Sequence, residues 1–389
     1  MNLVKISLRF LLSRKKYSYT NISLYLSIFS FSFAVCVSLI VISMSRGYKI
    51  ELEKSLMSIE PDLIITQQSN DFMNSFYIDS IYSLLLKSEN ANLFFSRFIE
   101  EYGMIKNSNY SKGILIYSID GEVDRFYTSV KTSNINYDNN YLLVSEEVFK
   151  KFDLENNMNI NLFNINKLIE DQSIKVKKIE KVDIYKTKIS TFNNNVIFLS
   201  LDDMKELFEI KDNNFTGILV NGIDSKTLNT LKLKTESFPL LFTRWDDKHN
   251  RTLHWLTIFT NPIYLILFFM IFLATIYQIF ANWLIFHDKS RSLYHLKIFG
   301  ISNKIITRIY HIISLTILFL SLSLGYATAL LLTYIQNKYN LLELDSTIYI
   351  LSGIKAITSF SDFLLILFFT FFFIFISTTL TLKKKLNLI

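Results

Sequence analysis

Residues 255–286 read WLTIFTNPIYLILFFMIFLATIYQIFANWLIF and contain no Asp, Glu, Lys or Arg. A helix that crosses a membrane needs about 20 mostly apolar residues, because the hydrocarbon layer is about 30 Å thick and a helix rises about 1.5 Å per residue. Three further stretches also lack these four residue types, namely 17–45, 309–337 and 363–382. The sequence therefore predicts an α-helical membrane protein with four transmembrane helices.

The composition agrees with this class of protein. Only 19% of the 389 residues are charged, whereas soluble chains carry about a quarter. The single Cys excludes an internal disulfide framework and a site with several Cys ligands. A net charge of +7 would favour nucleic acid as a partner if it lay on one soluble face. Instead, 13 of the 15 basic residues outside the long segment 46–253 lie beside the predicted helices on one side, so we expect no nucleic-acid partner.

These basic residues also orient the chain, because loops rich in Lys and Arg stay in the cytoplasm. Both termini are then cytoplasmic, and the protein is predicted to lie in a bacterial inner membrane with a large periplasmic domain. The predicted organisation is an interfacial amphipathic helix at 1–16, transmembrane helix 1 at 17–45, a periplasmic α+β domain at 46–252, transmembrane helix 2 at 253–286, a cytoplasmic loop at 287–308, transmembrane helix 3 at 309–337, a periplasmic connection at 338–362, transmembrane helix 4 at 363–382 and a cytoplasmic tail at 383–389.

Hydrophobic periodicity predicts a mixture of helices and strands in the exported domain. Helical spacing of apolar residues predicts helices at 75–86, 146–152 and 201–208, with Ser200 and Asp203 forming a capping box at the start of the last. Runs rich in Ile, Val and Tyr predict strands, and the Asn-rich joints 134–140 and 193–195 are interpreted as loops. The predicted strands are 62–67, 113–119, 141–144, 174–184 and 196–199.

No catalytic motif is present in the sequence. It lacks a phosphate-binding G-x-x-x-x-G-K-[ST] loop, H-E-x-x-H, G-x-S-x-G and C-x-x-C, so we predict a non-catalytic chain with no metal site and no cofactor of its own. His249 and His254 could in principle share a metal, but two ligands without a third favour structural roles. Cys36 is interpreted as a packing residue. Gln278 and Asn282 are interpreted as polar groups that bond between helices, with a transport pathway as the alternative.

Three further patterns concern packing and surfaces. Ser321, Gly325 and Ala329 recur every fourth residue, a spacing that lets helices approach closely. Leu3, Ile6 and Phe10 share one side of a helix that would lie along the membrane surface. In the loop 288–308, Leu293, Leu296, Phe299 and Gly300 predict a short amphipathic helix ending at Gly300, and Ser302 would cap the next helix. A solvated connector is the alternative for this loop.

Several segments of the chain resemble those of one known family. The segment Arg291-Ser-Leu-Tyr-His-Leu-Lys-Ile-Phe-Gly300 is similar to REIAILKALG, a segment of ABC-transporter permeases of the FtsX/MacB type. Three further segments resemble those of the lipoprotein-releasing subgroup, the LolC/LolE family. They are Ile6-Ser-Leu-Arg-Phe, Ser43-Met-Ser-Arg-Gly-Tyr and Leu344-Asp-Ser-Thr-Ile-Tyr-Ile. Val196-Ile-Phe-Leu-Ser-Leu-Asp-Asp-Met-Lys-Glu-Leu-Phe resembles a strand-and-helix element of the exported domain. Together, in this order, these segments span nearly the whole chain.

The resemblance implies a permease subunit of an ATP-driven complex that extracts lipoproteins from the inner membrane and releases them toward the outer membrane. It implies a LolD-like cytoplasmic ATPase dimer that binds ATP and Mg, a second permease subunit as homodimer or heterodimer, a lipoprotein substrate, a periplasmic lipoprotein carrier and membrane lipids as partners. Loop 287–308 would be the coupling helix, with these contacts to the ATPase: Lys289, Arg291, Leu293, Leu296, Lys297, Phe299 and Gly300. Acyl chains would lie beside these residues: Val37, Ile40, Val41, Met44, Trp255, Ile258, Phe259 and Ile263.

Departures from the family pattern leave alternatives open. Ser292 stands where the family has Glu, and the stretch 164–173 lacks the Pro of the carrier-binding loop. The chain could therefore be the carrier-binding type, the cargo-accepting type or both. Two other functions remain: an FtsX-like mechanotransmission permease that regulates a cell-wall hydrolase, and a MacB-type export permease. A membrane-embedded enzyme is disfavoured, because no titratable groups cluster in or beside the helices.

Overall fold

The computed structural model describes residues 19–69, 72–88, 92–107, 110–130, 141–154, 160–164, 175–179, 182–288, 295, 298–344, 350–351 and 353–386. The chain divides into two compact units. The helical unit comprises Met1–Lys49, Trp255–Glu343 and Gly353–Ile389. The sheet unit comprises Ile50–His254 and Leu344–Ser352.

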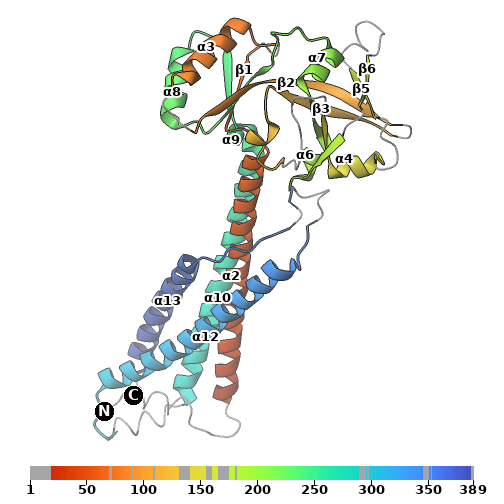
Figure 1. The fold of residues 1–389 in the computed structure, drawn as a ribbon. Coiled ribbons are helices and arrows are strands. Elements are labelled where there is room, and N and C mark those ends of the chain that lie inside the picture. Colours follow the sequence, from red (N-terminus) through yellow and green to blue (C-terminus); the bar gives the residue numbers. More distant parts are fainter. Residues whose placement is uncertain are drawn as a thin grey trace. The chain divides into compact units, whose positions relative to one another are not determined.

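Four long helices dominate the helical unit, and Figure 1 labels all four. They are α2 (Tyr19–Ser58), α10 (Asn250–Asp288), α12 (Asn303–Tyr339) and α13 (Phe360–Leu386). The last residues of α2 and the first residues of α10 belong to the sheet unit. The predicted surface helix at 1–16 lies outside the described residues.

Three of these helices are long and apolar enough to cross a membrane, judged on the described residues. They are Ile22–Ser58, Asn250–Ile285 and Asn303–Tyr339. The predicted fourth span lies within α13, whose described apolar part, Phe360–Ile376, is shorter than a span. The structure thus supports three of the four predicted spans, and the fourth stays a prediction.

Apolar side chains from all four helices form a common cluster in the helical unit. Phe31, Val35 and Cys36 of α2 pack with Ile271 of α10, and α12 and α13 contribute Leu318 and Ile366 among others. Cys36 is buried in this cluster, which confirms that it is a packing residue. The Ser27 hydroxyl donates to the Gln278 side-chain oxygen, so Gln278 bonds between α2 and α10 as predicted. Among the described residues, neither amide atom of the buried Asn282 has a hydrogen-bond partner.

In the sheet unit, the described strands form one mixed sheet in the order β10-β1-β9-β2-β3-β8-β4-β7, with β5 pairing β2 and β6. Most neighbours are antiparallel, while β3 with β8 and β4 with β7 are parallel. The strands are β1 (Leu63–Gln67), β2 (Phe94–Lys106), β3 (Ser111–Ile119), β4 (Leu142–Ser145), β5 (Ile160–Asn164), β6 (Val176–Ile179), β7 (Val182–Tyr185), β8 (Val196–Leu199), β9 (Gly217–Asn221) and β10 (Leu240–Arg244).

The two faces of the sheet bury different kinds of side chain. Successive residues of a strand point to opposite faces, so Ile116 and Ile197 lie in an aliphatic core while Tyr117 and Phe198 face the other way. On that second face, Tyr117 and Phe198 contact the ring of Tyr127, and Phe192 packs there as well. The sheet therefore has an aliphatic face and an aromatic face, both covered.

Short helices cover these faces. Residues of α3, α4, α7 and α8 belong to the aliphatic core, whereas Phe192 of α6 and Tyr127, which follows the 3-10 turn η1, belong to the aromatic face. A short α9 directly precedes α10. Figure 1 labels the α-helices among them. Their bounds are α3 (Ser75–Leu86), η1 (Val123–Arg125), α4 (Glu146–Lys151), α6 (Ser190–Asn195), α7 (Leu201–Phe208), α8 (Ser225–Lys234) and α9 (Trp245–Lys248).

Several predicted elements of the exported domain are confirmed. Helices α3 and α7 and strand β8 have the predicted bounds. Ser200 is the N-cap of α7: its hydroxyl accepts from the Asp203 amide and donates to the Asp203 carboxylate at 2.7 Å. The capping pair is therefore present, with the hydroxyl in place of the backbone N–H that a capping box would use.

Other predictions were wrong. The single strand predicted at 174–184 is two strands, β6 and β7, which pair with different neighbours. The joint 193–195 lies in α6 rather than in a loop, and hydrogen bonds of the buried Asn193 side chain with Thr187 and Glu147 hold this segment in place. The longest strand, β2, was missed, since its polar residues obscure the alternation of apolar residues. The Asn-rich joint 134–140 lies outside the described residues.

Candidate functional site

The predicted ATPase-coupling loop is described only at its end. Lys289, Arg291, Leu293, Leu296 and Lys297 lie outside the described residues. The Phe299 amide donates to the His295 carbonyl at 3.1 Å, which is a helical hydrogen bond, and Phe299 is 81% exposed. Gly300 has a φ of +78°, a conformation that favours glycine after a helix. Ser302 precedes α12, but its side chain makes no capping hydrogen bond.

The candidate acyl-chain residues lie on α2 and α10. Val37, Ile40, Val41 and Met44 are half-buried on α2, and Ile40 packs against the helical cluster. On α10, Ile263 is half-buried, whereas Trp255 and Ile258 are 61% and 52% exposed. The side chain of Phe259 lies outside the described residues. None of these residues lines the pocket between α3 and α8 or the pocket on the aromatic face of the sheet unit.

The small residues of α12 face another helix. Ser321, Gly325 and Ala329 are all buried. A Cβ atom added to Gly325 would lie 2.7 Å from the Ser32 carbonyl oxygen and 2.9 Å from the Val35 Cβ. The backbones of α12 and α2 therefore approach closely at Gly325.

An ion pair joins α2 to the start of α13. One guanidinium nitrogen of Arg46, Nη2, donates to Asp362 Oδ1 at 2.7 Å, and Nη1 lies 2.7 Å from Oδ2. The side chains are 32% and 14% exposed, so water screens this pair only partly. The pair thus joins a charge that follows the first apolar stretch to one that precedes the last.

The segment 353–359, between α12 and α13, is held against both α2 and α12. The Ile357 amide donates to the Ser43 carbonyl at 3.0 Å. Asn337 makes two hydrogen bonds of 2.8 Å with the backbone of Ala356. A Cβ atom on Gly47 would lie 1.6 Å from the Lys355 carbonyl oxygen. Glycine is thus required at position 47, because the segment crosses the helix there.

In the sheet unit, a buried carboxylate lies beside two basic residues. Glu60 follows α2 and is 6% exposed. Its oxygens lie 2.9 Å from Lys248 Nζ and 3.2 Å from His249 Nε2, just before α10 begins. This contact gives His249 a structural partner. No group of three or more His, Cys, Asp or Glu that could hold a metal occurs among the described residues.

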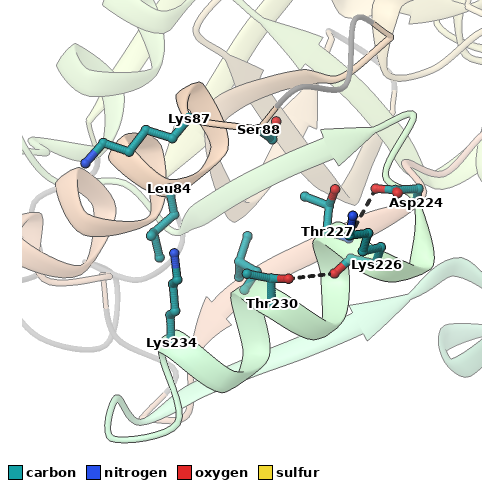
Figure 2. A pocket seen from close by; sticks show the side chains of 9 residues that line it. Leu84, Lys87, Ser88, Asp224, Lys226, Thr227, Thr230 and Lys234 are labelled. Atoms are coloured by element: carbon teal, nitrogen blue, oxygen red, sulfur yellow. Dashed lines mark hydrogen bonds between the residues drawn. The ribbon is translucent and has the colours of Figure 1, made fainter.

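A second feature of the sheet unit is an open pocket of about 490 Å³ between α3 and α8. Figure 2 shows Lys87, Lys226 and Lys234 around it, with Asp224 capping α8 through the Thr227 amide. The hydrogen bond from Thr227 lowers the pKa of Asp224. All three lysines are exposed, and the polar side chains that line the pocket are at most half-buried. None of the described residues that line the pocket is a buried polar group that could fix a ligand, so we assign no ligand to this pocket.

The sequence indicated only part of these arrangements. The segment Ser43-Met-Ser-Arg-Gly-Tyr resembles a family segment, yet nothing in it predicts its contacts. These contacts are Asp362 and Lys355, which lie more than 300 positions away in the sequence. Glu60 was missed altogether. The one available signal was a carboxylate close to the end of an apolar helix, with two basic residues just before the next one.

Comparison with known proteins gives partial likenesses only. No family model matches the chain, and no curated protein matches it. Among solved structures, the extracellular domain of the noncanonical ABC-type transporter YknZ from Gram-positive bacteria matches 47% of this chain and 99% of its own length, with 8% identity and a TM-score of 0.32. A domain of a putative permease protein from Porphyromonas gingivalis matches 47% of this chain and 88% of its own length, with 13% identity and a TM-score of 0.28.

Proposed function

We propose that this chain is the membrane-spanning permease subunit of an ABC-type complex, and that the complex extracts lipoproteins from the inner membrane and releases them toward the outer membrane. The observation that carries the proposal is the order of the family-like segments along the chain. Ser43-Met-Ser-Arg-Gly-Tyr falls at the end of the first apolar stretch, and the strand-and-helix element falls on β8 and α7. The segment 291–300 falls between α10 and α12.

The proposed reaction needs an external source of free energy. Each buried acyl CH₂ group contributes about 0.8 kcal/mol to membrane anchoring, so a lipid anchor does not leave the bilayer unaided. The sequence has no phosphate-binding loop, so a separate LolD-like ATPase dimer would bind ATP and Mg. That ATPase would contact the coupling helix in 287–308 from the cytoplasm.

The lengths of α2 and α10 fit a role in transmitting motion. They contain 40 and 39 residues, which is about 60 Å of helix against a hydrocarbon thickness of about 30 Å. Each helix would therefore extend well beyond the membrane. Acyl chains would lie beside the outer halves of the first two spans, near Met44 and Ile258.

The first experiment tests coupling to the ATPase. Arg291→Glu reverses a charge in the proposed coupling helix, so we expect it to weaken ATPase binding or stimulation while the protein still inserts into the membrane. Lys234→Glu makes the same change at an exposed residue of α8 and is the matched control. Unchanged ATPase stimulation by the Arg291→Glu variant would contradict the coupling-helix assignment.

The second experiment tests the cargo. Photo-crosslinkers at Met44 or Ile258 should capture lipoprotein in membranes that contain the complete complex. Crosslinkers at Leu324 of α12 and Phe368 of α13, which are both exposed, serve as controls. Capture only at the control positions would contradict the proposed location of the acyl chains.

Co-purification separates the proposed function from its alternatives. An ATPase, a second permease subunit and a lipoprotein carrier are the expected partners. An exported cell-wall hydrolase in place of lipoprotein would instead indicate the FtsX-like function. Recovery of an exported small molecule or peptide would indicate the MacB-type function.

A further inference from the structure

A pocket of about 270 Å³ lies on the aromatic face of the sheet unit. Most of its wall is apolar, and the residues come from the end of α2, from β3, from α6 and from β8. Ligand sites in proteins are mostly apolar concave pockets with a few placed polar groups. The apolar lining consists of Leu56, Ile59, Leu115, Ile189, Phe192, Val196 and Ile350.

The acidic and basic side chains of the pocket lie at one place. Glu60, Lys248 and His249 line it together, and the Glu60 carboxylate contacts both basic side chains. The three side chains differ in exposure: Glu60 is 6% exposed, His249 21% and Lys248 36%. The anion of this cluster is therefore largely covered, whereas the two basic side chains remain partly exposed.

Two tyrosines add neutral polar groups to the wall. Tyr117 and Tyr127 line the pocket and are almost completely buried. Burial raises the pKa of both phenols, and the nearby carboxylates of Glu60 and Glu100 raise it further. Both phenols thus stay uncharged at neutral pH. The accessible charge at the pocket is therefore that of Lys248.

We propose that this pocket binds a single-chain amphiphile with an acidic head group. The alkyl chain would lie along the apolar wall, and a carboxylate or phosphate would accept hydrogen bonds from Lys248 and His249. A cationic head would meet these donors first and is disfavoured. A volume of about 270 Å³ is near the lower end, about 300 Å³, of pockets that hold small ligands, so one chain fits better than a two-chain lipid. This site is separate from the acyl-chain residues on the spans and does not depend on the transport function.

Photolabelling of the full chain tests the proposal. The chain is reconstituted in nanodiscs of phosphatidylcholine, which has no net charge. Three probes carry the same diazirine-bearing alkyl chain and differ only in the head: a fatty acid, a lysophosphatidic acid and a fatty alcohol. Labelled peptides are identified by mass spectrometry. We expect one or both acidic probes to label the peptides that contain Leu115 and residues 189–196, and the alcohol to label them roughly fivefold less.

Two variants locate the binding within the pocket. Thr191 is exposed and lines the pocket, so Thr191→Trp should block it without disturbing the core. Lys248→Gln removes the positive charge of this side chain, and we expect labelling by the acidic probes to fall roughly fivefold. Thr230→Trp and Lys226→Gln make the same changes at exposed residues of α8 and should leave labelling unchanged.

The outcomes divide clearly. Labelling by the fatty acid alone identifies a carboxylate ligand, labelling by the phosphate probe alone identifies a phosphate ligand, and both results support the proposal. Labelling confined to the long helices overturns it. Equal labelling by the alcohol, or undiminished labelling of the Thr191→Trp variant, also overturns it. Capture of lipoprotein by crosslinkers on α2 and α10 is a separate readout, so failure here leaves the proposed function standing.

Discussion

Arg46 and Asp362 form a two-point ion pair, although 316 positions separate them in the sequence. The pair connects α2 with the first turn of α13. Each residue lies beside an apolar stretch that has no charges of its own, so each was readable from the sequence only as a flanking charge. Their contact shows that these flanking charges also hold two helices together.

Loss of this ion pair should weaken the helical unit. Arg46→Ala leaves the mostly buried Asp362 carboxylate without its cation, so we expect a loss of about 1–2 kcal/mol of stability. The apparent melting temperature of the purified protein measures this loss. Exchange of the two residues, Arg46→Asp with Asp362→Arg, should restore part of it. If the exchange variant is no more stable than Arg46→Ala, the pair itself contributes little.

A methyl group at position 47 should be more harmful than its size suggests. Ala normally stabilises a helix by about 1 kcal/mol relative to Gly. Here the added Cβ would overlap the Lys355 carbonyl, and overpacking of this kind costs about 1–3 kcal/mol. We therefore expect Gly47→Ala to lower the melting temperature. Gly353→Ala is the control, because no described atom beyond its chain neighbours lies within 4 Å of its added Cβ. A Gly47→Ala variant as stable as that control would show that segment 353–359 does not press on α2.

The close contact between α12 and α2 predicts that a larger side chain destabilises the helical unit on the buried side of α12 but not on its exposed side. Gly325→Val places a branched side chain against Ser32 and Val35, so we expect α12 to be displaced and the melting temperature to fall. Ser323→Val puts the same side chain on the exposed side of α12 and should be nearly neutral. Equal melting temperatures for the two variants would mean that α12 does not need a small residue at position 325.

The Glu146 ion pairs predict a pH dependence. Hydrogen bonds from Lys150 and Lys186 lower the pKa of Glu146 to about 2, from an ordinary value of 4.5. Because the folded-state pKa is lowered, the stabilisation is present above about pH 4.5 and is lost as the pH falls toward 2. Glu146→Gln should therefore lower the melting temperature at pH 7 but make little difference near pH 2. Both lysines are well exposed, so the difference at pH 7 should also shrink in high salt. A difference that is constant across this pH range would contradict the assignment.

Much of the architecture could be predicted from patterns of residues that are close together in the sequence. Apolar stretches without charge predicted the long helices, because a membrane demands length and hydrophobicity from each helix separately. The capping pair Ser200 and Asp203 marked the start of α7 for a similarly local reason. The strands β6 and β7 were merged into one, since only their different partners, β5 and β4, separate them.

The sequence by itself determined which segments are apolar helices, where the mixed domain lies and which sides of the helices carry the basic residues. These properties depend on residues that are close together along the chain. Only the tertiary structure decided the contacts between distant residues. Arg46 forms an ion pair with Asp362, and Gly47 lies against the Lys355 carbonyl. Glu60 contacts Lys248 and His249 beside an apolar pocket. Such contacts arise when helices and strands from distant parts of the chain pack together, and that packing has no periodicity in the sequence.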